Sequence, residues 1–299
     1  MKKWFASLAL GVALLASCGN DEKDAVNLNA SDNGAEQSTT IEEEHRIIAG
    51  TVVLADIMDQ LNLDAVAVPE TVKDLPARFE GLPTIGNAMD PDAEIIKSLN
   101  PTEVLSVSTL EYDLKDKFKQ LKIPVDFVDL TSIETMLSEI TEIGERYNRV
   151  AEAEALISEL QGEMDAVEQI SSDKKKPKVL ILLGVPGSYL VATEKSYAGD
   201  LVRLAGGENV MAGQDAEYLP SNTEYLYESN PDIILRLAHG MPDEVIEMFD
   251  DEFKTNDVWK HFAAVKNDEV YDLEEELFGT TAALNVSEAL NELVTIFYK

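Results

Sequence analysis

A long stretch with helical character divides this sequence of 299 residues into two parts. Between residues 132 and 172 there is no strand pattern, and apolar residues such as Met136, Ile140 and Ile143 recur at spacings of three and four. The pattern predicts a helix far longer than the usual 11–12 residues, with a bend near Gly144 as a variant. A coiled coil is the alternative, but the spacing is not a strict heptad. We therefore expect one rigid helix over residues 132–172 that joins two lobes.

Short apolar strands alternate with helices on both sides of that stretch. Strands are predicted at 46–50, 65–68, 103–107, 125–129, 178–183, 189–192 and 233–237, and helices at 51–61, 92–99, 110–121, 196–205 and 221–229. Such alternation is typical of a parallel sheet with helices on both faces. The sequence therefore predicts an α/β protein with two lobes, 46–131 and 173–299, each a central, mostly parallel sheet flanked by helices.

Two segments, one in each predicted lobe, resemble one another. Residues 94–105 (EIIKSLNPTEVL) and 224–235 (EYLYESNPDIIL) share Glu, Asn, Pro and Leu in the same register, and both have the pattern of a helix, an Asn-Pro stop and a strand. Glu94 and Glu224 are thus expected at equivalent places on the two lobes. A carboxylate in the first turn of a helix also interacts favourably with the helix dipole, which is the simpler interpretation.

The N-terminus has the pattern of an export signal. Two lysines precede an apolar run from Trp4 to Leu14 that is too short to span a bilayer, and Leu15-Ala16-Ser17-Cys18 follows it. This resembles the lipobox of bacterial lipoproteins, in which the cysteine is lipidated; an ordinary signal peptide with an incidental cysteine is the alternative. We expect a signal peptide over 1–17, a lipid anchor at Cys18 and a flexible polar tether over 18–45.

The charge and the cysteine content exclude other classes of protein. With 24 basic and 57 acidic residues the net charge is −33, which argues against nucleic-acid binding. One cysteine makes neither an intramolecular disulfide nor a cysteine-based zinc site. No Ser-His-Asp or Cys-His arrangement stands out, and the Gly-rich GVPGS segment at 184–188 lacks the ending of a phosphate-binding P-loop.

Two turn-prone segments contain candidate metal ligands. Met89 lies between Gly-Asn and Asp-Pro, an uncommon place for a methionine of the core, although a lone methionine is usually core filler. His239 follows the strand at 233–237, at the carboxyl end where ligands bind in open parallel sheets, and Gly240 leaves room for a flat ligand. Met241 is the rival sulfur ligand, while His261 is expected at the surface.

Several motifs resemble a known family. The lipobox, the two α/β lobes, the joining helix and the paired Asn-Pro segments are similar to the metal-chelate class of solute-binding proteins of ABC transporters, the class III arrangement. The second half is more specific: GVPGSYLVAT (184–193), NPDIILRLAHGM (230–241) and WKHFAAVKN (259–267) resemble the haem-receptor lipoproteins of the iron-regulated surface determinant system. The resemblance covers residues 46–299 and is strongest from 177 to 275.

This resemblance implies a function and a set of site residues. Matching the family's Gly-x-x-Met-x-Pro and His-Gly-Met-Pro stretches implies that Met89 and His239 are the axial ligands of the iron of haem b. Thr51, Val52, Thr71 and Val72 match the regions near the haem propionates, though an apolar Val72 offers no side-chain hydrogen bond. Glu94 and Glu224 match the carboxylates that dock onto the permease. The chain would deliver haem to an ABC permease from the outer face of the cell membrane, with cell-surface haem donors upstream.

The ligand pair favours carriage over catalysis. Methionine and histidine are neutral ligands that suit low-spin iron, and two occupied axial positions leave none for oxygen chemistry. The sequence leaves other functions open: a receptor for a ferric siderophore or a corrinoid on the same fold, a tetrapyrrole metal chelatase with two α/β lobes, or a zinc receptor. The three histidines, one of them in the tether, disfavour zinc.

Overall fold

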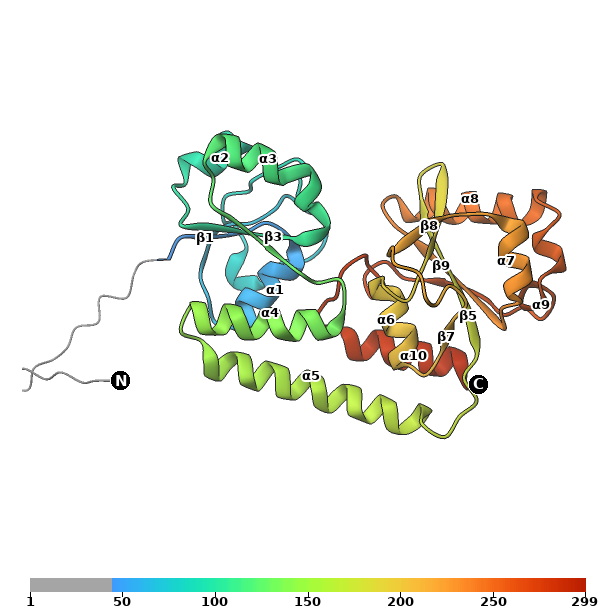
Figure 1. Ribbon diagram of the computed structural model, residues 1–299. Helices are drawn as coiled ribbons and strands as arrows, with labels where there is room; N and C mark the ends of the chain where they lie inside the picture. Colours follow the sequence, from blue (N-terminus) through green and yellow to red (C-terminus); the bar gives the residue numbers. More distant parts are fainter. Residues whose placement is uncertain (1–44) are drawn as a thin grey trace, which may run out of the picture. The chain divides into compact units, whose positions relative to one another are not determined.

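The computed structural model describes residues 45–299, without the side chains of residues 223–225, and contains two β-sheets (Figure 1). The predicted signal peptide, the lipidation site Cys18 and the tether up to residue 44 lie outside the described residues. Four strands form the first sheet, in the order β2-β1-β3-β4, and every pairing is parallel. They are β1 (Ile47–Ala49), β2 (Ala65–Ala67), β3 (Glu103–Val107) and β4 (Val125–Val128).

Helices cover both faces of this first sheet. Ile47 and Ala49 of β1 pack into one apolar cluster, while Ile48 between them packs into another, because successive side chains point to opposite faces. One face carries α1 (Val52–Gln60) and α4 (Ile133–Arg146); the other carries α2 (Ala93–Ser98) and α3 (Glu111–Leu121) (Figure 1). A strand covered on both faces reads as a continuous apolar run, which explains the pattern in the sequence.

The predicted continuous helix over residues 132–172 is wrong in one respect. The structure has two helices there, α4 and α5 (Val150–Ser171), and the chain reverses between them (Figure 1). Asn148 has φ +57° at the reversal, a left-handed conformation that asparagine adopts more readily than other residues with a side chain. Gly144 allows the two helices to meet, since a Cβ there would lie 2.6 Å from that of Ala153. Only α5 leads on to the second lobe.

The second sheet is mixed. Its order is β10-β9-β5-β6-β8, with β7 paired to β5, and three of its five pairings are parallel. The antiparallel pairings involve β6, because the GVPGS segment turns the chain straight back as a hairpin, with Gly187 at φ +81°. The strands are β5 (Lys178–Val185), β6 (Ser188–Ala192), β7 (Glu208–Asn209), β8 (Tyr218–Pro220), β9 (Ile233–Ala238) and β10 (Val270–Leu273).

Helices also cover both faces of the second sheet. Val179 and Ile181 pack with α6 (Tyr197–Leu204) and α10 (Val286–Phe297), while Leu180 and Leu182 pack with α8 (Pro242–Thr255). The remaining elements are η1 (Ala77–Phe79), η2 (Ser108–Leu110), α7 (Thr223–Ser229), η3 (Trp259–His261) and α9 (Ala263–Lys266). The larger apolar cluster continues from the first sheet through α4 and α5 to α6 and α10, so both lobes share one core.

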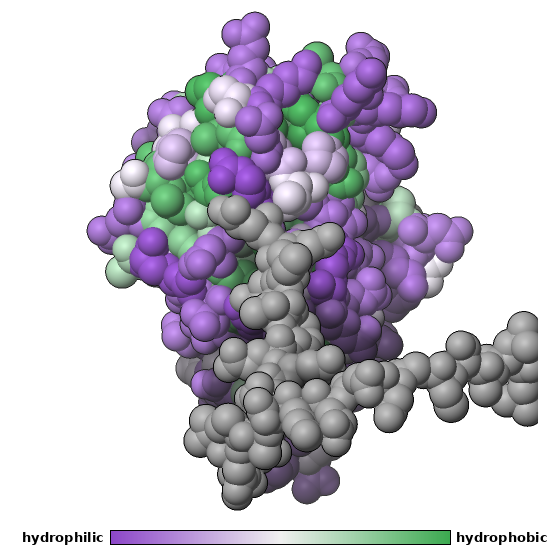
Figure 2. Space-filling model, turned by 90° about the vertical axis from the view of Figure 1, so that its left-hand side faces the viewer, coloured by the Kyte–Doolittle hydropathy of each residue, from purple (hydrophilic) through white to green (hydrophobic). Residues whose placement is uncertain are grey.

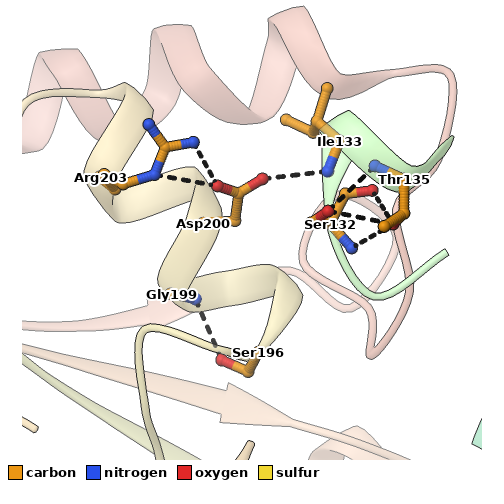
Figure 3. Close-up of polar contacts among 7 residues, drawn as sticks. All are labelled: Ser132, Ile133, Thr135, Ser196, Gly199, Asp200 and Arg203. Carbon is orange, nitrogen blue, oxygen red and sulfur yellow. Dashed lines mark hydrogen bonds and ion pairs between the residues drawn. The ribbon is translucent and has the colours of Figure 1, made fainter. Parts of the chain in front are cut away.

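A buried carboxylate connects the two lobes (Figure 3). Asp200 on α6 accepts the backbone N–H of Ile133, the first residue of α4, at 3.0 Å. Its other oxygen accepts two bonds from the guanidinium of Arg203, one turn further along α6. Ser132 and Thr135 form a capping box at the same helix end. The N-terminal end of α4 is therefore stabilised both by its own capping box and by Asp200 of the opposite lobe.

The surface agrees with the acidic composition. Hydrophilic side chains cover most of the face shown in Figure 2, with smaller apolar areas between them. Within residues 45–299, none of the helices combines the length and the apolar character needed to cross a membrane.

Candidate functional site

His239 follows directly after the buried strand β9. All residues of β9 are buried, and the backbone N–H of His239 donates to the carbonyl of Gly184 on β5 at 2.9 Å. Gly240 and Met241 after it have φ +61° and +54°, which turns the chain away into α8. The side chain of His239 is 41% exposed and faces a cavity. The strand thus delivers the imidazole to the carboxyl edge of the sheet, as the sequence predicted.

The partner of this imidazole could not be inferred from the sequence. Nδ1 of His239 is buried and lies 2.9 Å from Oε1 of Glu275, which follows β10 by two residues. The two atoms make a close polar contact, although its geometry falls short of a hydrogen bond. The contact with His239 is the main cause that lowers the pKa of Glu275 below its usual range, and the N–H of Gly240 also contributes. Nδ1 is thereby occupied, and Nε2 is left for a ligand.

Met89 lies in a loop between β2 and α2, and not in the core. The side-chain oxygen of Asn87 accepts the backbone N–H of Met89 at 2.8 Å, and its carbonyl accepts that of Asp90 at 3.1 Å. Gly86 begins the loop with φ +83°. The thioether side chain is 65% exposed, which is unusual for a methionine and leaves the sulfur accessible. The loop therefore presents the sulfur instead of packing it.

A single cavity of about 830 Å³ brings these groups together. Its walls come from both lobes: Met89 and Val107 from the first, His239 and Leu284 from the second. The volume lies within the usual range for small-molecule sites of about 300–1,000 Å³. The four residues predicted near a propionate also line it, namely Thr51, Val52, Thr71 and Val72. The structure thus brings six predicted residues to one cavity.

One part of the cavity wall suits an anion. Thr51 precedes α1, makes no side-chain cap, and its buried hydroxyl has no hydrogen-bond partner among the described residues. The first N–H groups of a helix also lack partners within the helix, so they can bind an anion. Lys73 is the one basic side chain among the residues that line the cavity. The free donors at the start of α1 and the cation of Lys73 thus line the same cavity.

An acidic residue of the same wall has an unusual pKa. Burial is the main cause that raises the pKa of Asp56 on α1 to about 6, and the negative charge of Asp59 adds to it. Lys73 acts in the opposite direction. Burial thus keeps Asp56 protonated to a higher pH than an exposed aspartate, which reduces the negative charge of this wall at mildly acidic pH.

The other predicted residues lie away from this cavity. Met241 is 55% exposed but does not line it, and His261 is exposed on η3. His45 is exposed, with its ring edge against Tyr147 at 4.9 Å between centroids. Glu94 is exposed in the first turn of α2, and Glu224 lies on α7.

The cavity does not resemble a cluster of hard metal ligands. Across residues 45–299 no group of three or more His, Cys, Asp or Glu side chains could hold a metal ion. A thioether and an imidazole are instead neutral ligands that suit an iron which brings its own four equatorial nitrogens, as in haem.

Residues 48–277 match the family model of the periplasmic binding proteins, so the chain belongs to the periplasmic binding protein family. It is 46% identical over 298 residues to the high-affinity heme uptake system protein IsdE of Staphylococcus aureus strain Newman, with 99% of this chain and 98% of that protein covered.

Solved structures agree in fold. The crystal structure of S. aureus IsdE complexed with heme matches with a TM-score of 0.83 and 50% identity, over 86% of this chain and all of that one. An ABC transporter substrate-binding protein from Listeria monocytogenes EGD-e matches with the same TM-score and 55% identity, over 86% and 99%.

Proposed function

We propose that this protein is a haem receptor that delivers haem to an ABC permease, and that Met89 and His239 are the axial ligands of the iron. One observation carries the proposal: a thioether and an imidazole from two lobes line the same cavity. The similarity to S. aureus IsdE over nearly the whole chain supports haem as the ligand.

The cavity wall supports an orientation for the haem. The propionates lie towards the start of α1 and the loop after β2, where Thr51 and Thr71 line the cavity. The free hydroxyl of Thr51, the helix end behind it and the cation of Lys73 favour negative charge there. Val52 and Val72 contribute backbone groups or apolar contact, since neither side chain can donate a hydrogen bond.

Haem titration tests the proposed ligands. The purified protein with added haemin should give a Soret band and a six-coordinate, low-spin spectrum. His239→Ala and Met89→Ala should each lose that spectrum and weaken haemin binding by roughly 100-fold, the upper end of what outer-shell changes cost a metal site. Met241→Ala and His261→Ala are the matched controls, because both residues are exposed and neither lines the cavity. An unaltered spectrum in either ligand variant contradicts its assignment.

The same titration separates the alternatives. A protein that ignores haemin but binds a ferric siderophore or a corrinoid would be a receptor of the same fold with another cargo. Turnover in a porphyrin-metallation assay would indicate a chelatase. Neither outcome is expected, since the relatives reported above are an uptake protein and a substrate-binding protein.

Two further roles complete the proposal. Glu94 and Glu224 dock onto the permease: Glu94 is exposed and lines no part of the cavity, so Glu94→Lys with Glu224→Lys should stop haem uptake and leave haemin affinity unchanged. Loss of binding in that double variant would contradict docking.

A lipid on Cys18 anchors the protein to the outer face of the cell membrane. Cys18→Ser should release the protein into the soluble fraction, and continued membrane association would contradict the anchor.

A further inference from the structure

The pairing of β9 with β10 determines which residue lies beside His239. The two strands are parallel, with Arg236 opposite Asp272 and Leu237 opposite Leu273. The same register, continued two residues past this last pair, brings His239 opposite Glu275, just beyond the ends of β9 and β10. Glu275 lies in the turn that follows β10, so the ladder sets where this turn begins, and the contact with His239 holds the side chain.

A buried ion pair stabilises that register. The guanidinium of Arg236 makes two bonds to the carboxylate of Asp272, at 2.7 and 2.5 Å, and it also contacts Asp250 at 2.9 Å. The side chain of Arg236 is only 8% exposed, so a slip of the ladder would leave a buried charge without its partner. Removal of one partner from such a pair costs several kcal/mol, which disfavours any other register. His239 and Glu275 each follow this fixed pair by three residues, so the pair limits how far their two segments can shift relative to one another.

Glu275 is itself held in place. Its Oε1 atom lies 2.9 Å from Nδ1 of His239 and accepts the backbone N–H of Gly240 at 3.2 Å. Its side chain is 20% exposed, while that of His239 is 41% exposed. Glu275 also lines the cavity, and its carboxylate is less exposed than the imidazole that it contacts.

We infer that Glu275 is the positioning residue for His239: its carboxylate fixes Nδ1 and thereby directs Nε2 at the haem iron. The inference rests on the proposed function, in which His239 is an axial ligand. Only one ring nitrogen can bind the iron, and the partner of the other decides which one does so. A negative charge beside Nδ1 also makes the imidazole a stronger electron donor, which favours ferric over ferrous haem.

Isosteric variants test this role. Glu275→Gln keeps the size of the side chain and removes its charge; Glu276→Gln removes one charge from the neighbouring position in the same cavity wall. We expect Glu275→Gln to weaken ferric haem binding by about 10-fold or more and to raise the haem reduction potential. A tenfold loss of preference for the ferric form corresponds to about 59 mV for one electron. Glu276→Gln removes a charge from the same wall, and it should shift both quantities by less than Glu275→Gln does.

A double variant shows whether the effect passes through the histidine. In a His239→Ala background, Glu275→Gln should have no further effect on affinity or potential, because the group on which it acts is absent. Equal potential shifts in Glu275→Gln and Glu276→Gln, or an undiminished effect of Glu275→Gln without His239, would overturn the inference. Glu275→Asp, which keeps the charge, should have a potential closer to wild type than the glutamine variant.

These experiments distinguish a failure of the proposed ligands from a failure of the positioning role of Glu275. If the wild-type protein binds no haemin, or if His239→Ala keeps the six-coordinate spectrum, the ligand assignment fails whatever Glu275 does. If those tests succeed and the variants of Glu275 match their controls, only the positioning role fails.

Discussion

Replacement of Asp200 by alanine should destabilise the folded protein by about 2–3 kcal/mol. The carboxylate side chain is 9% exposed and accepts the N–H of Ile133 from the opposite lobe (Figure 3). A buried donor left without an acceptor costs about 1–3 kcal/mol. The pair with Arg203 adds at most about 0.5–1 kcal/mol, because the side chain of Arg203 is 62% exposed and its charge is screened by solvent.

Urea unfolding measures this loss. The urea concentration at the midpoint of unfolding should fall without a change in the slope m. In thermal unfolding, the same loss corresponds to a fall in Tm of roughly 4–12 °C for a domain of this size. Arg203→Ala is the control for the exposed half of the network and should cost no more than about 1 kcal/mol. Asp200→Asn keeps an acceptor oxygen for Ile133 and should recover part of the loss.

The relative stabilities of the three variants show whether the hydrogen bond between the lobes stabilises the fold. If Asp200→Ala is no less stable than Arg203→Ala, the bond between the lobes contributes nothing, and the capping box of Ser132 and Thr135 suffices to stabilise the start of α4. If Asp200→Asn is as damaging as alanine, the charge is the stabilising feature, and the argument from an unpaired N–H is refuted.

Three other changes probe single features of the fold. Gly184→Ala should cost about 1–3 kcal/mol in urea unfolding, because the added Cβ would lie 2.6 Å from a ring carbon of Phe249; unchanged stability would mean that α8 moves freely. Asn148→Ala should cost about 1 kcal/mol and Asn148→Gly little, since φ is +57° there; equal costs would refute the conformational explanation. The pKa of Asp56 is raised to about 6 in the folded state, so the folded protein binds the proton of this carboxyl group more tightly than the unfolded chain does. Ionisation of Asp56 therefore lowers the stability of the folded protein as the pH rises from about 4 to 6. Asp56→Asn should therefore be more stable than wild type by about 1 kcal/mol above pH 6, after allowance for screening, and this advantage should vanish towards pH 4; a constant difference would refute it.

Much of the fold was accessible from the sequence because local pattern and tertiary environment agree in it. The buried runs at Ile47–Ala49 and Ile233–Ala238 are strands covered on both faces, and both were predicted. The reversal at Asn148 was missed because it uses no glycine or proline: one residue with φ +57° ends α4, and the apolar spacing continues almost unbroken into α5. The local signals were the left-handed tendency of asparagine and the glycine at position 144, near which a bend was considered.

The functional site likewise contains residues that the local sequence predicts and residues that it does not. His239 stands at a strand end, so local pattern marks it, whereas Met89 stands in a turn-prone segment and was predicted mainly from the family resemblance. Glu275 carries no such mark, since it is 36 residues from His239 and reaches it only through the register of two strands. Lys73 is similar: nothing in its own segment shows that it is the basic residue of the cavity wall. Contacts that depend on strand pairing or on lobe packing cannot be read from neighbours in sequence.

The helix α5 makes this protein unusually sensitive to insertions and deletions. Its 22 residues span about 33 Å at 1.5 Å per residue, and it packs against α4 of one lobe and α10 of the other (Figure 1). One extra residue between Leu160 and Val167 would rotate everything after it by about 100°. The apolar side chains could then face α4 or α10, but not both. Substitutions on the exposed side of α5 should be tolerated freely, whereas changes in its length should alter how Met89 and His239 meet.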